Sequence, residues 1–417
     1  MILFILLLSS CTDEDSGIPA PPTSEIPLSI ELTSEWTGWY SSWWSIPQSY
    51  NKVPKYSGAF GTYTHKHIPV AINSQGGLFS VRTDNSEDDN FYVYVMKNNT
   101  EVKVHTIKNW NDPHTNAAIN IDEQGYVWVH IASRGLAHKF QSGKVLKSNT
   151  PFELDFQCVD GCNNINYEAY PQIHNAFGVQ YLIYTRYEAS DTGISSRRRT
   201  YSKVQGNHLR LSKLSHYNVS HFDEETNRLC VASNTLVNGS PDNRVNLSFI
   251  CTKDTSGEWY TLNEKVNFDK EDETNRIVFN SKGKFVYLKD IISYKGLFRV
   301  MFTLSNTDDP TSGSRELCEW VEGSSVQCIT SVGHNYSAGA YTIKDGELFL
   351  VVGKSAVEYY LSGSLYLYKV KGSSYHLEST LSDNEYSYIR RVRNGEGSFV
   401  GSVGQSDLQR RGEHYLL

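Results

Sequence analysis

The feature that most constrains the fold is a succession of short segments in which every second residue is apolar. From residue 28 onward, no segment sustains the roughly 3.6-residue period of an amphipathic helix, whereas period-2 alternation of β-branched and aromatic residues is typical of strands. These segments are residues 91–96, 126–131, 181–184, 229–232, 245–250, 285–288, 297–303, 348–352 and 364–370. The sequence therefore predicts an all-β protein made of many hairpins.

Turn-forming residues separate these segments and repeat on a longer scale. Gly-containing turns rich in Asn and Asp occur at residues 73–77, 122–125, 280–283, 344–346 and 394–397. A strand follows each turn at a spacing of roughly 40 to 60 residues, which suits one four-stranded blade of a β-propeller. We therefore predict a seven-bladed β-propeller, with six or eight blades as alternatives, and a strand near residues 36–44 that closes the ring.

The N-terminal segment predicts export. Residues 1–11 form an apolar run that ends in Leu8-Ser9-Ser10-Cys11, and it is too short for a membrane span, which needs about 20 apolar residues. The order of these residues resembles a bacterial lipoprotein signal, which implies that Cys11 becomes lipidated; an ordinary signal peptide cut nearby is the alternative. Residues 12–27, which contain Ser16, Pro19, Pro21 and Pro22, are expected to form a flexible tether. Residues 28–417 are the expected propeller domain. We expect an outer-membrane or cell-surface lipoprotein, or else a periplasmic or secreted protein.

Six further cysteines permit disulfides in an exported protein. Cys318 and Cys328 flank a Gly-containing loop and can face each other across a hairpin. Two further pairs are candidates: Cys158 with Cys162 in a tight loop, and Cys230 with Cys251 in neighbouring strands. A zinc site that uses a cysteine and histidines is the rival use of these residues. A structural metal, zinc or calcium, is left open.

Composition narrows the class of partner. The chain has 27 Tyr, 17 Phe and 8 Trp, and Tyr and Trp both form strands and stack on sugar rings. Its net charge of -7 argues against nucleic acid, because phosphate binding needs a basic field. The sequence has no nucleophile elbow, P-loop, zinc-protease or dinucleotide motif. We expect a monomer that needs no catalytic cofactor and meets the membrane only through its lipid anchor.

Polar residues that could carry chemistry concentrate between His114 and Asn246. They lie in Asp112-Pro-His114, in Tyr170-Pro-Gln172 with Arg186 sixteen residues later, in His216-Tyr217-Asn-Val-Ser220 and in Asp242-Asn-Arg244. This order of motifs resembles the BNR-4 type of repeat protein, and within it the ulvan lyases built on a seven-bladed propeller. The resemblance covers roughly residues 55 to 265.

The resemblance implies β-elimination beside a uronic acid in a sulfated, ulvan-like acidic polysaccharide. Such a reaction needs neutralisation of the carboxylate, a base for the C5 proton and an acid for the leaving O4. By position, Tyr170 is the expected base and acid, Arg186 the neutralising cation, His114 a second acid/base group and Tyr217 a positioning hydroxyl. The expected substrate-binding residues are His130, Arg134, Asn234 and Arg244; Arg134 and Asn234 replace histidines of the related lyases.

Each residue also has a structural interpretation, and the protein has two other candidate functions. Tyr170 could be a packed strand-end aromatic, Arg186 a partner in a surface ion pair and His130 a core residue. Residues 197–199, all Arg, could be a solvated loop or an electrostatic guide.

A non-catalytic glycan-binding propeller shares the cleft but does not use the Tyr170 proton. A sialidase-like glycoside hydrolase is suggested by residues 252–259, which resemble an Asp-box turn.

Overall fold

The structure is a computed structural model, and it covers the greater part of the expected β domain. It describes residues 33–45, 54–57, 66–84, 90–98, 100–108, 115–133, 143–159, 168–188, 197–237, 243–270, 272–307, 314–333, 335, 337, 339–354, 363–382, 385–404 and 409–417. Cys11 and the expected tether lie outside these residues.

The described strands form six antiparallel sheets. Three four-stranded sheets follow one another along the chain. The first contains β3 (Ala71–Ser74), β4 (Gly77–Asp84), β5 (Phe91–Lys97) and β6 (Thr100–Ile107). The second contains β7 (Ala117–Ile121), β8 (Val127–Ile131), β9 (Lys144–Ser148) and β10 (Phe156–Cys158). The third contains β11 (Ala169–Ala176), β12 (Val179–Glu188), β13 (Arg197–Val204) and β14 (Asn207–Arg210).

The remaining strands form three further sheets. An eight-stranded sheet contains β15 (Val219–Asp223), β16 (Arg228–Leu236), β17 (Arg244–Thr252), β18 (Ile277–Phe279), β19 (Phe285–Tyr294), β20 (Leu297–Ser305), β21 (Arg315–Val321) and β22 (Val326–Ser331), with the 3-10 turn η5 (Thr274–Arg276) before β18. A four-stranded sheet contains β23 (Gly339–Lys344), β24 (Glu347–Lys354), β25 (Ser364–Lys371) and β26 (Ser374–Leu381). The last contains β27 (Glu385–Arg391), β28 (Ser398–Gly404), β29 (Gln409–Leu416), β1 (Thr33–Ser45) and β2 (Pro54–Ser57).

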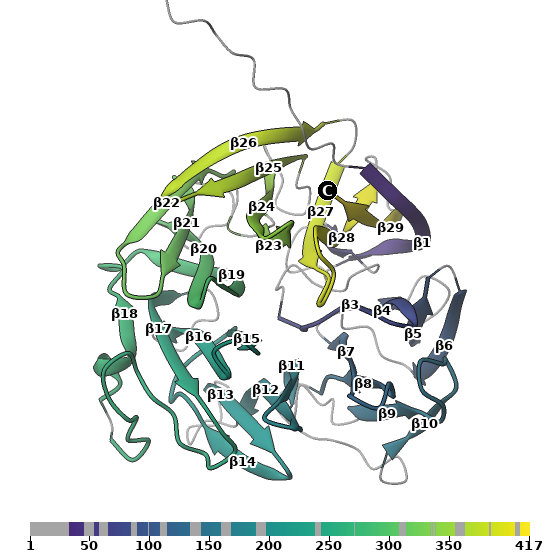
Figure 1. Cartoon of the computed structure of the whole chain (residues 1–417), viewed down its shortest axis with the longest axis horizontal. Helices are drawn as coiled ribbons and strands as arrows, with labels where there is room; N and C mark the ends of the chain where they lie inside the picture. Colours follow the sequence, from purple (N-terminus) through teal and green to yellow (C-terminus); the bar gives the residue numbers. More distant parts are fainter. Residues whose placement is uncertain are drawn as a thin grey trace, which may run out of the picture.

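The sheets surround a common centre in a propeller-like arrangement. Figure 1 shows β3, β7, β11, β15, β19, β23 and β27 nearest to that centre. The N-terminal strand β1 pairs with the C-terminal strand β29 from Thr33↔Leu416 to Ser42↔Gln409.

The prediction of an all-β fold is confirmed. The count of seven blades stays a prediction, because the single pair Val245↔Phe285 joins β17 to β19 and merges two expected units into one sheet.

Apolar side chains from neighbouring sheets form the core. In β8, the alternate residues Val127, Val129 and Ile131 are fully buried, and they pack with Val81 and Val93 of the preceding sheet. Burial of a sheet between two neighbours removes apolar surface on both faces and stabilises the arrangement by about 25 cal/mol per Å². The inner strands are thereby held in place, and the residues at their ends take fixed positions around the centre.

The structure also tests the cysteine predictions. Disulfides join Cys230 to Cys251 and Cys318 to Cys328, and each pair lies opposite in the register of its hairpin. These two of the three predicted pairs are confirmed. Cys158 is disulfide-bonded as well, whereas Cys162 lies outside the described residues.

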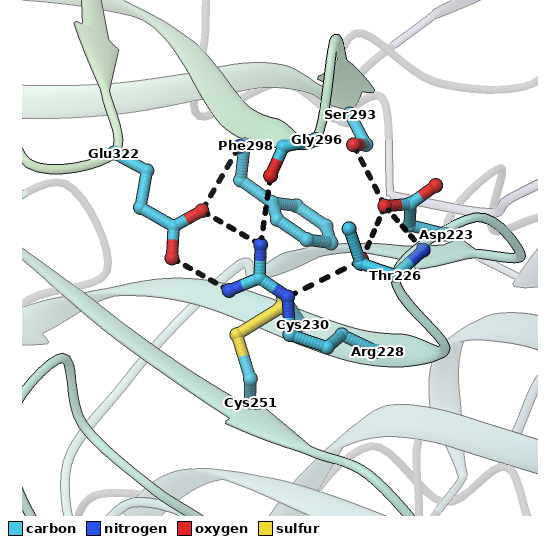
Figure 2. Close-up of a disulfide and its surroundings, with 9 residues drawn as sticks. All are labelled: Asp223, Thr226, Arg228, Cys230, Cys251, Ser293, Gly296, Phe298 and Glu322. Atoms are coloured by element: carbon cyan, nitrogen blue, oxygen red, sulfur yellow. Dashed lines mark hydrogen bonds and ion pairs between the residues drawn. A yellow bond between two sulfur atoms is a disulfide. The ribbon is translucent and has the colours of Figure 1, made fainter.

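A bidentate ion pair lies close to the first of these disulfides. Figure 2 shows Arg228 between Glu322 and Thr226. The guanidinium Nη1 and Nη2 atoms of Arg228 donate to the two carboxylate oxygens of Glu322 at 2.7 and 3.0 Å, and Nη2 also donates to the carbonyl oxygen of Gly296 at 3.0 Å. The pair therefore links β16 to the hairpins of β19 to β22.

Candidate active site

Two tyrosines of the predicted site have an unusual backbone conformation. Tyr170 in β11 has φ of +54° and Tyr217, just before β15, has φ of +65°. Bulky residues rarely adopt a positive φ, and the strain of about 1–3 kcal/mol for each is commonly found at functional sites. The register of β11 with β12 shifts between Ala169 and Gln172, so a β-bulge re-aims the Tyr170 side chain.

Tyr170 and Tyr217 come together with two further residues, and we call Tyr170, Tyr187, His216 and Tyr217 the tyrosine cluster. The Tyr170 and Tyr217 rings lie 5.0 Å apart in an edge-to-face arrangement, and the His216 ring stacks on Tyr217 at 3.6 Å. All four side chains are buried, and Tyr170 has no exposed surface. The predicted proximity of Tyr170 and Tyr217 is thus present, at the ends where β11 and β15 begin.

Hydrogen bonds connect three members of the tyrosine cluster in a row. The Tyr187 hydroxyl donates to the Tyr170 hydroxyl oxygen at 3.1 Å, and its oxygen lies 2.9 Å from His216 Nε2. Because the Tyr187 proton is used on Tyr170, Nε2 of His216 must carry a proton for the second contact to be a hydrogen bond. The row therefore runs from His216 through Tyr187 to Tyr170, and can pass a proton between buried groups.

Cationic side chains border the tyrosine cluster. The guanidinium of Arg244 lies 4.7 Å from the centre of the Tyr217 ring, and that of Arg198 lies 5.2 Å from the Tyr187 ring. His67 contacts Tyr170 with ring centroids 5.3 Å apart. Positive charge at these distances favours a negative charge that develops on the cluster or on a bound ligand. Arg244 lies beside the tyrosine cluster, and its role in substrate binding stays a prediction. Arg198 lies in strand β13, not in a solvated loop.

Arg186 lies on the other face of β12. Successive side chains of a strand point to opposite faces, so Arg186 and Tyr187 diverge. The Arg186 guanidinium lies 3.5 Å from Glu188 Oε1 and 5.5 Å from the Tyr201 ring. Arg186 also makes a side-chain hydrogen bond with Tyr184. Its expected role beside the Tyr170 hydroxyl stays a prediction.

His130 is held by a buried carboxylate. Its Nε2 lies 2.9 Å from Glu168 Oε2, and Lys203 Nζ lies 2.7 Å from Glu168 Oε1. Burial by itself would raise the pKa of Glu168, but the hydrogen bond and charge of His130, together with Lys203, lower that pKa to about 2. Glu168 is therefore a carboxylate that clamps His130 of β8 and Lys203 of β13 at the start of β11.

The other predicted site residues have different outcomes. Asn234 of β16 lies beside the tyrosine cluster, because its Oδ1 accepts the backbone N–H of His216 at 3.4 Å. His114 and Arg134 lie outside the described residues, so their roles stay predictions. Two features of this region were missed in the sequence, namely Tyr187 and the buried lysines Lys66 and Lys289. The alternation of β12 limited the choice to Arg186 or Tyr187, but no local pattern could decide which one faces Tyr170.

Neither a metal-binding cluster of side chains nor a membrane-spanning helix occurs in the described part of the chain. It contains no group of three or more His, Cys, Asp or Glu side chains arranged to hold a metal ion. It also contains no helix with the length and apolar character needed to cross a membrane.

Comparison with known proteins gives a structural likeness without a sequence relative. No family model matches the chain, and no curated protein matches it. The structure is similar to a PL25 ulvan lyase bound to -[GlcA(1-4)Rha3S]-, with a TM-score of 0.63 and 12% identity over 92% of this chain and 96% of that chain. A second structure of a PL25 ulvan lyase gives the same TM-score with 13% identity and the same coverage. The polysaccharide lyase Uly1 follows with a TM-score of 0.62 and 10% identity over 93% of this chain and 99% of that chain. At these identities the likeness establishes the fold shared with polysaccharide lyases.

Proposed function

We propose that this protein is a polysaccharide lyase on a seven-bladed β-propeller that cleaves an acidic, uronate-containing polysaccharide by β-elimination. The observation that carries the proposal is the tyrosine cluster. It joins a Tyr170 hydroxyl in a strained backbone to a row of hydrogen bonds that ends on His216, within a fold shared with ulvan lyases.

The chemistry assigns a role to each member of the row. Tyr170 as phenolate takes the C5 proton of the uronate, and the resulting hydroxyl then protonates the leaving O4. The Tyr187 hydroxyl, 3.1 Å from the Tyr170 oxygen, stabilises the phenolate by donating a hydrogen bond to it. His216 Nε2 lies 2.9 Å from the Tyr187 oxygen, so its N–H holds the Tyr187 hydroxyl in line with Tyr170. The row itself neither gains nor loses a proton, because Tyr170 passes the C5 proton on to O4.

Neutralisation of the uronate carboxylate falls to cations at the edge of the tyrosine cluster. Arg244 contacts Tyr217 and also lies 4.3 Å from the Tyr287 ring. A guanidinium held between two aromatic faces keeps its charge and presents N–H groups to a carboxylate. We assign this task to Arg244, and a supporting electrostatic role to Arg198.

The proposed substrate is a sulfated polymer in which a uronic acid alternates with another sugar, as in the -[GlcA(1-4)Rha3S]- ligand of the similar lyase. We further propose that the protein is exported and anchored by a lipid on Cys11. The substrate proposal rests on the motifs and on the structural likeness, whereas the anchoring proposal rests on residues 1–11 of the sequence alone. Each can be tested separately from the reaction.

The decisive experiment is incubation of the purified protein with ulvan and with other uronate polymers. Wild type is expected to generate the ultraviolet absorbance of an unsaturated uronate, whereas hydrolysis would leave no double bond. Tyr170→Phe should abolish the signal, and Tyr294→Phe, whose hydroxyl bonds the Gly346 carbonyl oxygen on the surface, should retain it. A wild-type protein that is silent on every uronate polymer would contradict the proposal.

A second candidate function is a non-catalytic glycan-binding propeller. It is favoured by the complete burial of Tyr170, since a substrate reaches that hydroxyl only after neighbouring side chains move. This candidate predicts that wild type binds oligosaccharide without cleaving it and that Tyr170→Phe binds equally well. Titration calorimetry with an acidic oligosaccharide, run beside the cleavage assay, separates the two functions.

A further inference from the structure

A pocket of about 350 Å³ lies between the inner strands β15, β19 and β23 and the turn that joins β27 to β28. Pockets that bind small molecules have volumes of about 300–1,000 Å³. The lining consists of His221, Ile292, Thr342, Ile343 and residues 391–396. It contains no member of the tyrosine cluster, and the four residues from Tyr217 to His221 span about 13 Å of extended chain. The pocket is therefore separate from the candidate active site.

Hydrogen bonds on two sides fix the turn that forms one wall of the pocket. On one side, the backbone N–H of Arg393 donates to the Ala71 carbonyl oxygen at 3.0 Å, and its Nη2 donates to His174 Nδ1 at 3.2 Å. On the other side, Glu396 Oε1 accepts the backbone N–H of Asp345 at 2.7 Å. The wall is thus held against β3, β11 and the hairpin of β23 and β24, and a preformed wall lowers the entropy cost of binding.

Arg391 has hydrogen-bond donors that the fold does not use. Its Nη2 donates to the Ile291 carbonyl oxygen at 3.0 Å, and the same nitrogen lies 3.5 Å from His221 Nδ1 and 3.7 Å from Asp290 Oδ1. A guanidinium has five N–H donors, one on Nε and two on each Nη. Within the described residues, the donors on Nε and Nη1 of Arg391 have no acceptor, so they are available to a ligand.

His221 adds a neutral donor beside Arg391. Because a guanidinium only donates, Nδ1 of His221 is the acceptor of the contact with Arg391, and the ring proton lies on Nε2. Burial, followed by the charges of Arg391 and Arg393, holds the pKa of His221 well below its usual value, so the ring is neutral near pH 7. Its Nε2 forms no hydrogen bond with any described residue, which leaves that N–H for a ligand.

The lining also carries apolar surface and an unsatisfied hydroxyl. Ile292, Ile343 and Val392 supply the apolar surface. Thr342 is buried, and its Oγ1 has no hydrogen-bond partner in the described part of the chain. Native structures contain few buried polar groups without a partner. The carboxylate of the lining, Glu396, is exposed to water and already accepts a hydrogen bond, so solvent screens its charge.

We propose that this pocket binds a small organic molecule that carries a carboxylate. The carboxylate accepts N–H donors of Arg391 and His221, and one carboxylate can reach both because the two side chains are already in contact. The carbon body of the ligand packs on the apolar residues of the lining. A charged donor favours a carboxylate over a neutral group of similar size. Sugar acids and simple organic acids share this chemistry, and the site is independent of the proposed lyase reaction.

Titration calorimetry of the full chain with three probes at constant ionic strength tests the proposal. The probes are sodium glucuronate as a sugar acid, sodium glutarate as a simple organic acid and methyl glucoside as a neutral sugar. At least one acid is expected to bind about 10-fold or more tightly than methyl glucoside, and the acid that binds identifies the source of the carboxylate. Failure of both acids to bind, or equal binding of the neutral sugar, would overturn the proposal.

Two arginine variants assign the binding to one site. Arg391→Met removes the charged donors and should weaken acid binding about 10-fold or more. Arg244→Met, which lies at the tyrosine cluster, should bind the acid as wild type does. The reverse pattern would place the acid at the candidate active site and contradict the inference.

A second pair of variants changes charge at exposed positions that tolerate the exchange. Asn394 lines the pocket with φ of +55°, and Asn98 lies in a distant turn with φ of +51°. Both are exposed, and Asp accepts this backbone conformation as Asn does. Asn394→Asp brings a negative charge to the pocket and should weaken acid binding about 5-fold, whereas Asn98→Asp should not. Equal affinities in these two variants would count against the proposal.

A crystal structure of wild type soaked in the tighter-binding acid needs no variant. Density for the acid is expected in the pocket, with its carboxylate within hydrogen-bond distance of Arg391. An empty pocket, or density for the acid at the tyrosine cluster alone, would contradict the inference.

Discussion

At the scale of single residues, the Tyr187 hydroxyl is the link on which the proposed reaction depends. We expect Tyr187→Phe to lower kcat about 10- to 100-fold with little change in KM, because it removes the donor to Tyr170 and breaks the path to His216. Cleavage rates measured over a range of pH check this, because loss of the donor to the Tyr170 phenolate shifts the rise of the rate to higher pH.

The control for this prediction is a tyrosine on the same strand. Tyr184 of β12 binds His208 Nδ1 at 2.7 Å through its hydroxyl and lies, by alternation, on the face opposite Tyr187. Tyr184→Phe should leave kcat and the pH profile close to those of wild type. Equal losses in both variants would show that packing of β12, and not the hydrogen-bond row, sets the rate.

Glu168 gives a prediction for stability. Its pKa of about 2 lies below its ordinary value of 4.5, so its stabilising contribution is complete above pH 4.5 and is lost as pH falls through the folded-state value. The depressed pKa corresponds to about 3 kcal/mol in the free energy of unfolding.

Urea unfolding of wild type and Glu168→Gln at several pH values measures this contribution. The variant should be less stable by about 3 kcal/mol at neutral pH, and the difference should shrink between about pH 4.5 and pH 2. A difference that stays constant through this window would mean that Glu168 does not gain its stability from His130 and Lys203.

At the scale of elements, Arg228 connects β16 with the hairpins of β19 to β22. It makes a bidentate ion pair with Glu322, and the side chains are 19% and 13% exposed. Charge-assisted pairs of this geometry are the strong ones, so Arg228→Met should lower the free energy of unfolding by about 2 kcal/mol.

Chemical denaturation with a matched surface pair tests this value. Lys369 and Glu347 lie 4.0 Å apart, with the Glu347 side chain 46% exposed. Lys369→Met should change stability by less than about 0.5 kcal/mol, because exposed pairs contribute little. If the two variants lose equal stability, the link between β16 and the neighbouring hairpins is weaker than its geometry indicates.

At the scale of the whole molecule, pairing of β1 with β29 joins the two ends of the described chain. Removal of residues 1–45 would delete β1 and expose the edge of β29, and unpaired edges promote aggregation. We expect this truncation to lower the unfolding midpoint by at least about 10 °C and to produce aggregates in size-exclusion chromatography.

A shorter truncation that stops before Thr33 keeps β1 and serves as control. It should retain a monodisperse peak and a higher midpoint than the longer truncation. If the two truncations behave alike, the β1–β29 ladder does not stabilise the closed arrangement of Figure 1.

The sequence alone determined the features that local chemistry controls. Alternation and turn residues specified the all-β architecture, because side-chain period and turn geometry act over a few residues. The disulfides Cys230–Cys251 and Cys318–Cys328 could be predicted for the same reason, since each joins neighbouring strands that are close in sequence.

Tertiary structure decided the composition of the candidate site. The bulge at Tyr170 and the choice of Tyr187 over Arg186 as its neighbour depend on how β11 and β12 meet the next sheet. The burial of Lys66 likewise depends on contacts between distant segments, because its Nζ donates to the carbonyl oxygen of Leu288, 222 residues away in sequence. Such groups meet only when the ring of sheets closes, and no short-range pattern in the chain records their proximity.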